Sequence, residues 1–268
     1  MIKQYFLIGL LFLSGTLLFN GCAKNDASEP TFSPEATATI VTATPLPTQA
    51  PLPKEENEEE IKKENDTAMI EQTINYEEYF SISKITEDIF SRMKGKSYPN
   101  NCTLDLETLR YVTVAYLNFD GEICKGELIV NAQIAEDVLS IFKELLGEKY
   151  PIESITLIDE YNADDNLSMA ANNSSAFCYR VISGTDRLSN HSFGLAIDIN
   201  PLYNPYIKNN GQVLPEEAEA FADRTDSNPY YITSDDICVR IFKKYGFTWG
   251  GDWTNSKDYQ HFEKKLSE

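Results

Sequence analysis

Two histidines stand out because they are the only ones in a chain of 268 residues. His191 lies in the segment Ser189–Pro201, which also contains Asp198, and His261 lies in the segment Asp258–Glu263. Two imidazoles and one carboxylate form the ligand set of a catalytic zinc site, whose fourth position is left open for water. Each motif alone is common, but together they account for every histidine in the chain. We therefore expect one Zn²⁺ ion to be bound by His191, Asp198 and His261.

The residues around Asp198 alternate as they do in a strand. One face of this expected strand carries Gly194, Ala196 and Asp198, and the other carries Leu195, Ile197 and Ile199. Because successive side chains of a strand point to opposite faces, the branched apolar face should pack on a core. The small residues on the other face should leave room beside the carboxylate.

Asp258 precedes His261 by three residues and is the candidate general base. A carboxylate beside a zinc-activated water can accept a proton from it. The alternative role for Asp258 is to cap a helix or a turn, because aspartate favours such positions.

Three motifs together carry a resemblance to a known family. They are Ser-x-His-x-x-Gly-x-Ala-x-Asp, Trp-Gly-Gly-Asp-Trp and Asp-x-x-His-Phe-Glu, and the likeness extends from about Leu106 to Glu263. This pattern resembles the zinc peptidases of bacterial cell walls, which comprise VanY-type D-alanyl-D-alanine carboxypeptidases and L-alanyl-D-glutamate endopeptidases. The resemblance implies hydrolysis of peptide bonds in the stem peptides of peptidoglycan. One departure is that Cys178 and Tyr179 precede Arg180, where related sequences tend to place Asn-Cys.

The resemblance assigns further roles around the zinc site. Arg180 corresponds to an arginine that stabilises the carbonyl oxygen during hydrolysis, and its alternative is a surface arginine at a strand end. Ser189 corresponds to a serine that hydrogen-bonds a ligand or the substrate. Either Asp252 or Glu263 is expected to accept a hydrogen bond from a metal-binding histidine.

Trp249 and Trp253 are candidates for the walls of the substrate cleft, although aromatic residues more often belong to the core. Besides Arg180, the motif-bearing region before the final helix contains only Arg187 and Arg224 as arginines. Removal of a terminal D-alanine requires a cation for the free carboxylate of the substrate. Few such cations are offered by this acidic domain. The aspartate base in Asp-x-x-His, together with Trp-Gly-Gly-Asp-Trp, resembles the L-alanyl-D-glutamate endopeptidases more than the D,D-carboxypeptidases, and the resemblance therefore favours an endopeptidase.

The first 75 residues carry export signals rather than a core. Residues 1–21 form an apolar run that predicts a signal peptide, and Cys22 directly after it predicts a lipoprotein cleavage site, with an uncleaved anchor as the alternative. Residues 22–75 are rich in Thr, Pro and Glu, which predicts a disordered tether. We therefore expect an exported protein, anchored through lipidated Cys22 to the outer face of the bacterial cytoplasmic membrane.

Residues 76–268 should form the single peptidase domain, because about 190 residues suffice for one core. The chain has a net charge of −19, and 18 basic and 31 acidic residues leave −13 on this domain. An acidic domain without a basic patch argues against nucleic acid as a partner. We expect a monomer.

The apolar patterns predict an α+β fold in which an antiparallel sheet carries the zinc ligands and helices surround it. The expected helices span 76–92, 132–146 and 234–245, and the expected strands span 109–117, 126–130, 152–158 and 177–182. An exported domain permits disulfides, of which Cys102–Cys124 is favoured because these residues flank one strand. Buried free thiols at these positions and at Cys178 and Cys238 are the alternative.

Two functions from different classes remain open at this point. One is an active zinc peptidase that acts on peptidoglycan stem peptides. The other is a non-catalytic lipoprotein that binds the cell wall and retains the peptidase fold. A degenerate binder should lose a ligand or the base, and Asp258 and the ligand set are complete, which favours the enzyme.

Overall fold

The computed structural model describes residues 76–182 and 184–266. The predicted signal peptide, Cys22 and the tether all lie outside these residues. In the described part of the chain, no helix combines the length and the apolar character that a membrane crossing requires.

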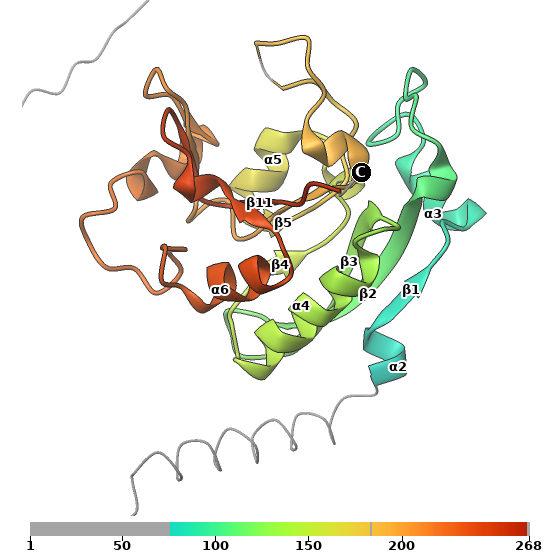
Figure 1. Cartoon of the computed structure of the whole chain (residues 1–268), viewed down its shortest axis with the longest axis horizontal. Helices are drawn as coiled ribbons and strands as arrows, with labels where there is room; N and C mark the ends of the chain where they lie inside the picture. Colours follow the sequence, from blue (N-terminus) through green and yellow to red (C-terminus); the bar gives the residue numbers. More distant parts are fainter. Residues whose placement is uncertain (1–75, 183, 267–268) are drawn as a thin grey trace, which may run out of the picture. The chain divides into compact units, whose positions relative to one another are not determined.

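The N-terminal part of the domain is a three-stranded antiparallel sheet in the order β1-β2-β3, covered by one long helix. Its elements are α2 (Tyr76–Tyr79), β1 (Ser81–Ser83), α3 (Glu87–Met93), η1 (Leu106–Thr108), β2 (Leu109–Leu117), β3 (Ile123–Asn131) and α4 (Ala135–Gly147). Figure 1 shows α4 lying along β2 and β3. Val112 and Val114 of β2 and Phe142 of α4 are fully buried in one core cluster, so this packing removes a continuous apolar surface from water.

The C-terminal part is built from short strands in three small sheets. Their orders are β6-β11-β9, β10-β7-β8 and the parallel pair β4-β5. The strands are β4 (Ser154–Ile155), β5 (Asn173–Ser174), β6 (Ala196–Asp198), β7 (Tyr206–Ile207), β8 (Val213–Leu214), β9 (Thr248–Trp249), β10 (Lys257–Asp258) and β11 (His261–Glu263). The helices between them are η2 (Ile158–Tyr161), α5 (Asp165–Ala170), η3 (Asn190–Phe193), η4 (Glu216–Phe221), α6 (Ile237–Lys244) and η5 (Gly250–Asp252).

Helix α6 joins the two parts of the domain. Lys244 Nζ lies 2.7 Å from Glu144 of α4, and the hydroxyl of Tyr245 donates to the same carboxylate at 2.5 Å. Phe242 of α6 stacks on Phe262 of β11 with ring centroids 4.1 Å apart. Through Phe262, the core behind α4 extends to the strand that carries His261.

The α+β class is confirmed, and β6 and β11 do pair antiparallel in one sheet. The strand predicted over 109–117 matches β2 at both ends, and the one predicted over 126–130 is longer, as β3. The helix expected from residue 132 begins three residues later, because Asn131–Ile134 form a turn closed by Ile134 N–H donating to Asn131 O at 3.1 Å. Helix α6 begins after Asp236, whose side chain accepts from Cys238 N–H at 2.7 Å.

Several expectations for other segments are wrong. The single helix over 76–92 is divided by β1, because residues 81–83 pair with β2 and Thr86 starts a second helix as its N-cap. Only Ser154–Ile155 of the strand expected over 152–158 is a strand, and residues 177–182 contain only an isolated bridge of Val181 with Leu188. Ile152, Leu157, Ile158 and Phe177 are buried without belonging to a strand, and periodicity cannot distinguish such burial from strand pairing. Val181, by contrast, is 51% exposed.

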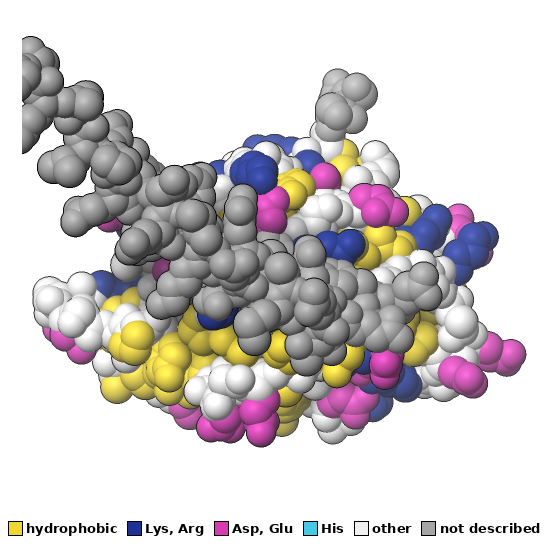
Figure 2. All heavy atoms as spheres, turned by 90° about the horizontal axis from the view of Figure 1, so that it is seen from below, with side chains coloured by type: hydrophobic (Ala, Val, Ile, Leu, Met, Phe, Trp, Pro, Cys, Tyr) yellow, Lys and Arg dark blue, Asp and Glu magenta, His cyan; other side chains and the backbone are white. Residues whose placement is uncertain are grey.

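The cysteines of the described residues are all free, so the favoured Cys102–Cys124 disulfide is wrong. Cys178 and Cys238 are buried, and burial raises the pKa of Cys178 to about 12, which keeps this thiol neutral. Figure 2 shows one face of the molecule. Acidic and basic side chains are interspersed on this face, and no histidine is visible on it. Both histidines are buried, with exposed fractions of 3% for His191 and 6% for His261.

Candidate metal centre

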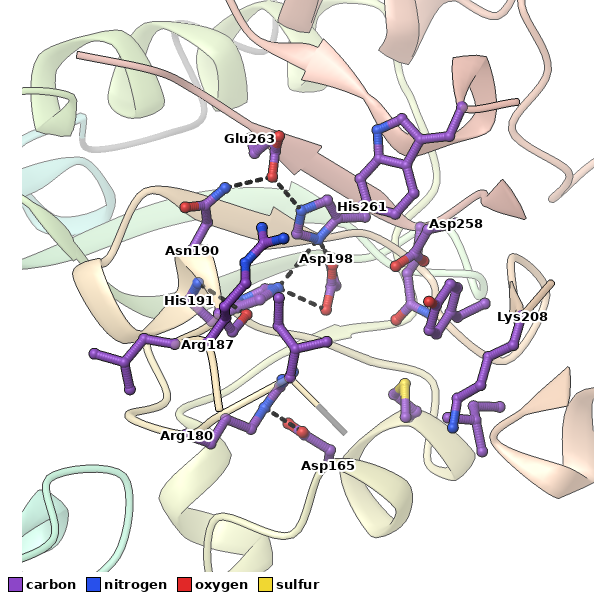
Figure 3. Close-up of a pocket in the computed structure, with 18 of the residues that line it drawn as sticks. Asp165, Arg180, Arg187, Asn190, His191, Asp198, Lys208, Asp258, His261 and Glu263 are labelled. Atoms are coloured by element: carbon purple, nitrogen blue, oxygen red, sulfur yellow. Dashed lines mark hydrogen bonds and ion pairs between the residues drawn. The ribbon is translucent and has the colours of Figure 1, made fainter. Parts of the chain in front are cut away.

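His191, Asp198 and His261 converge in the described structure (Figure 3). His191 Nε2 lies 3.1 Å from Asp198 Oδ2, His261 Nδ1 lies 3.0 Å from Asp198 Oδ1, and the two ring nitrogens are 3.2 Å apart. The convergence follows from sheet register, because His261 of β11 is the direct cross-strand partner of Asp198 of β6. Residues 63 positions apart in sequence thus become neighbours.

His191 is held by the short helix η3. The Ser189 hydroxyl caps this helix by accepting from His191 N–H at 3.3 Å, and Gly194 ends it with a φ of +65°. The ring nitrogen Nδ1 donates to the carbonyl oxygen of Ala176 at 2.5 Å. Because a carbonyl only accepts, Nδ1 carries the proton, and Nε2 keeps its lone pair toward Asp198 and His261.

The expected role of Gly194 needs correction. We expected it in a strand, as a small residue beside the site, but it lies before β6 in a left-handed turn. A Cβ at this position would lie 2.6 Å from the backbone nitrogen of Asn131 and 2.9 Å from the carbonyl carbon of Val130. Gly194 therefore allows the turn after His191 to lie against the end of β3.

His261 is oriented by Glu263, two residues further along β11. His261 Nε2 lies 3.1 Å from Glu263 Oε2, and Asn190 Nδ2 donates to the same oxygen at 2.5 Å. The hydrogen bond from His261, together with the one from Asn190, lowers the pKa of Glu263 to about 2, against the opposing effect of burial. An ionised Glu263 accepts from Nε2–H, so Nδ1 is the nitrogen left to face Asp198.

Burial lowers the pKa of His261, but hydrogen bonds to Asp198 and Glu263 outweigh burial and raise this pKa to about 10. Burial opposes ionisation of Asp198 as well, and the neighbouring His191 and His261 hold the pKa of this carboxyl well below its usual range. The cluster therefore has a fixed buried anion surrounded by nitrogen ligands. Such a cluster suits a divalent cation, which takes the place of the shared protons.

The donor set fits a zinc ion by chemistry and by spacing. Zinc binds imidazole nitrogen and carboxylate oxygen at about 2.0–2.2 Å, so neighbouring ligands of a tetrahedral ion are about 3.3–3.5 Å apart. The two ring nitrogens are 3.2 Å apart, and each lies 3.0–3.1 Å from one of the two oxygens of Asp198, so the separations are close to these values. The hydrogen bonds of His191 Nδ1 to Ala176 and of His261 Nε2 to Glu263 leave His191 Nε2 and His261 Nδ1 as the nitrogens that face the metal position, and zinc would displace the proton from His261 Nδ1.

Asp258 lies beside this triangle because the chain bends at residues 259 and 260, between β10 and β11. The bend places Asp258 and His261, three residues apart, on the same cavity wall. Asp258 Oδ1 is buried and has no hydrogen-bond partner among the described residues. Burial raises the pKa of Asp258 to about 7, even though His261 lowers it. A nearby dication would favour the ionised form of this carboxyl.

Gly250 allows β10 to approach at this point. A Cβ on Gly250 would lie 2.5 Å from the carbonyl oxygen of Asp258 and 2.8 Å from its Cβ. The Trp-Gly-Gly-Asp-Trp motif thus determines where the candidate base stands, a role that we did not expect from its sequence. The presence of glycine in a sequence motif does not tell which distant segment of the backbone will pack against it.

Arg180 also lines this cavity, and its Nε is in ion-pair contact with Asp165 Oδ2 of α5 (Figure 3). Burial lowers the pKa of Arg180, but the charges of Asp165 and Asp198 outweigh burial, so that the arginine stays protonated. The expectation of a surface arginine at a strand end does not fit this position.

The structure separates the remaining candidates. Ser189 and Trp253 line the cavity, and the Trp253 ring centroid lies 5.5 Å from that of His261. Trp249 is a core residue, 3% exposed, whose Nε1 donates to Tyr259 O at 2.8 Å, so its assignment to the cleft wall is wrong. Asp252 is exposed and pairs with Lys243 at 2.8 Å, so it does not contact either histidine.

The cavity has a volume of about 760 Å³ and contains cations that the motifs did not identify. Arg187, Lys208 and Lys265 line it in addition to Arg180. Arg224 does not, because it is held against the rings of Tyr231 and Tyr259 at 3.9 and 4.3 Å. Asp165, Asn190, Lys208 and Gln260 are lining residues that sequence analysis missed, and only the adjacency of Asn190 and Gln260 to the histidines hinted at them.

Comparison with known families gives one match, which covers part of the chain. Residues 183–264 match a family model described as D-alanyl-D-alanine carboxypeptidase. The matched segment contains His191, Asp198, Asp258 and His261, so the resemblance inferred from the motifs is confirmed there, and the match supports a peptidase. Searches of curated proteins and of solved structures found no match.

Proposed function

We propose that this protein is a zinc-dependent peptidase that hydrolyses peptide bonds in the stem peptides of peptidoglycan. The observation that carries the proposal is the triangle of His191, Asp198 and His261, with the unpartnered Oδ1 of Asp258 on the same cavity wall. The family match over residues 183–264 supports a peptidase independently of this geometry.

Each residue of the site has a separate role in the proposed hydrolysis. Zinc, when bound, supplies a Lewis acid and makes water a nucleophile near neutral pH. Asp258 accepts a proton from the attacking water at Oδ1 and then delivers it to the nitrogen of the leaving amine. Arg180 donates to the carbonyl oxygen as negative charge develops on it. Glu263 and Ala176 hold the two imidazoles in place.

The cavity cations bear on which bond is cut. The preference for an endopeptidase rested on the resemblance of the motifs and in part on the scarcity of arginines, and Lys208 and Lys265 line the cavity together with Arg187. No carboxylate of the described residues forms a salt bridge with any of these three side chains. They suit a substrate with a free carboxylate near the metal, so we propose D-alanyl-D-alanine carboxypeptidase activity first. Cleavage of the L-alanyl-D-glutamate bond is the second candidate, favoured by the resemblance of the aspartate base.

We also propose that the protein is exported and anchored through lipidated Cys22, because Asn20-Gly21-Cys22 ends the mostly apolar run from Tyr5 to Phe19. The substitution Cys22→Ser should release the protein from the membrane fraction or block its processing. A wild-type protein found soluble and cleaved after Cys22 would contradict this proposal.

The decisive experiment for the activity is mass spectrometry of a stem pentapeptide incubated with the purified, zinc-loaded protein. Release of free D-alanine identifies the carboxypeptidase, and cleavage between L-alanine and D-glutamate identifies the endopeptidase. The double variant His191→Ala/His261→Ala is the control and should neither bind stoichiometric zinc nor cleave. Binding of peptidoglycan without cleavage by the zinc-loaded wild type would instead support the wall-binding lipoprotein.

A further inference from the structure

The cavity contains a carboxylate that the proposed hydrolysis does not use. Asp165 is the first residue of α5, lines the same cavity as the metal triangle, and is in ion-pair contact with Arg180 through Oδ2. The preceding residue, Asp164, is the helix N-cap and accepts from Asn166 and Leu167 N–H at 3.0 and 3.2 Å. Asp165 therefore does not cap the helix, and its carboxylate is free to pair with Arg180.

The backbone of Arg180 is fixed to the turn that carries His191. Arg180 N–H donates to Ser192 Oγ at 2.8 Å, and the same hydroxyl donates to Arg180 O at 2.7 Å. Ser189 N–H also donates to Arg180 O, at 3.0 Å. Two residues earlier, Cys178 N–H donates to His191 O at 3.2 Å. The Cα of Arg180 is thus held relative to the metal triangle, and the direction of its long side chain is the remaining freedom.

Asp165 removes that freedom in a particular way. Its Oδ2 is in ion-pair contact with Nε, the inner nitrogen of the guanidinium group. The Nε–H does not meet hydrogen-bond geometry with this or any other acceptor of the described residues, so the contact is one of charge. Nη1 and Nη2 form no hydrogen bond with any of the described residues, so the outer edge of the guanidinium group keeps its donors. The side chains of Arg180 and Asp165 are 32% and 27% exposed, which places the pair at the cavity surface rather than in the core.

We propose that Asp165 is a positioning residue, which holds Arg180 by Nε so that the Nη groups face the carbonyl oxygen of the scissile bond. This inference rests on the proposed peptidase activity. A donor aimed in advance at the developing charge loses little freedom when the transition state forms, whereas a loose arginine must be ordered at that moment. Asp165 then affects turnover through Arg180 and has little part in binding the metal or the ground-state substrate.

The test is a double-mutant cycle on the zinc-loaded, full-length protein with the stem pentapeptide. Asp165→Asn should lower kcat by about 10- to 100-fold and change KM and zinc content by less than about twofold. In the Arg180→Ala background, the same Asp165→Asn change should have almost no further effect, because its route of action is gone. Asp165→Glu, which retains the charge, should restore part of the lost kcat.

Two further measurements separate positioning from mere structure. Asp164→Asn removes the same charge one residue away and keeps a good N-cap, so it should leave kcat unchanged. In the metal-free protein, the Nε–H proton of Arg180, assigned with the Arg180→Lys variant, should exchange slowly with solvent by NMR and become fast in Asp165→Asn.

Each outcome decides the inference. Equal losses of kcat from Asp165→Asn in both backgrounds, or fast exchange of the Arg180 Nε–H in the wild type, would overturn it while leaving the peptidase proposal intact. A wild-type protein that loads zinc but cleaves no stem peptide would overturn the proposed function, and the inference with it.

Discussion

The two parts of this domain place their residues by different means. Strands β2 and β3 are neighbours in sequence and pair over nine residues each, from Leu109 opposite Asn131 to Leu117 opposite Ile123. Strands β6 and β11 have three residues each and join positions 63 apart. The first sheet is stable through its own length and its apolar face, whereas the second needs the surrounding core to hold it. Local sequence thus specifies the scaffold, and tertiary packing specifies the site.

Two arginines, Arg92 and Arg180, show the same contrast. Arg92, in the N-terminal part, donates from Nη1 and Nη2 to the two oxygens of Glu127 at 2.8 Å each, and Nη2 also reaches Glu160 at 3.0 Å. Both Nη groups of Arg92 therefore donate hydrogen bonds within the protein. Arg180 is held by Nε alone, and its Nη groups donate to none of the described residues. The partners of Arg92 occupy both of its Nη groups, as is usual for an arginine that stabilises the fold. The partner of Arg180 contacts only Nε, so its Nη groups stay available in the cavity.

The largest effect should come from removing the base without disturbing the scaffold. Asp258→Asn should lower kcat by about 10²- to 10⁴-fold, because Asp258 Oδ1 is the one buried carboxylate oxygen of the described residues without a hydrogen-bond partner. Bound zinc, measured by atomic absorption, should stay at one ion per chain. Asp252→Asn is the matched control, since Asp252 is exposed and pairs only with Lys243. Normal turnover by Asp258→Asn would remove this residue from the mechanism.

A substitution in the core should lower the stability of the fold and leave the chemistry of the site intact. Phe142 of α4 is fully buried in the main core, so Phe142→Ala should lower the free energy of unfolding by about 3–5 kcal/mol. Turnover per folded molecule should be unchanged at a temperature where the variant is still folded. Leu167→Ala, at a position 57% exposed, should have almost no effect on chemical denaturation. Equal effects of the two variants would contradict the assigned core.

A smaller effect should arise where scaffold and site meet. Gly250→Ala places a Cβ within 2.5–2.8 Å of Asp258, so β10 must shift and displace the base. We expect kcat to fall by about 10- to 100-fold, with a much smaller change in melting temperature. Gly147→Ala, where a Cβ meets nothing within 4 Å, is the control. Unchanged kcat in Gly250→Ala would show that Asp258 tolerates the displacement.

The smallest effect should be a pH-dependent one in the N-terminal part. Hydrogen bonding to Arg92 lowers the pKa of Glu127 below its ordinary value of 4.5, even though burial opposes this shift. A carboxyl with a lowered folded pKa stabilises the protein above its unfolded pKa, and this stabilisation is lost as the pH falls through the folded pKa. Glu127→Gln should therefore cost about 1–2 kcal/mol at pH 7, and the difference from wild type should shrink below about pH 4. A difference that is independent of pH would contradict this account.

The sequence alone determined the chemistry and the local elements. The residue types at 191, 198 and 261 predict a zinc ligand set, and alternation or helical periodicity located β2 and most of α4. Both kinds of information are local, because ligand preference belongs to the side chain and periodicity to a short stretch of backbone. The same information also favoured Glu263 and Asp252 equally as partners for a histidine.

Only the tertiary structure decided between such candidates. Glu263 contacts His261 because both lie on β11, whereas η5 turns Asp252 toward Lys243 in the solvent. Trp249 and Trp253 flank the same motif, yet one enters the core and the other lines the cavity. The pairing of Asp165 with Arg180 joins a helix start to a distant extended segment. These outcomes depend on which distant segment of the chain each residue packs against, and the spacing of residues in the sequence does not determine those contacts.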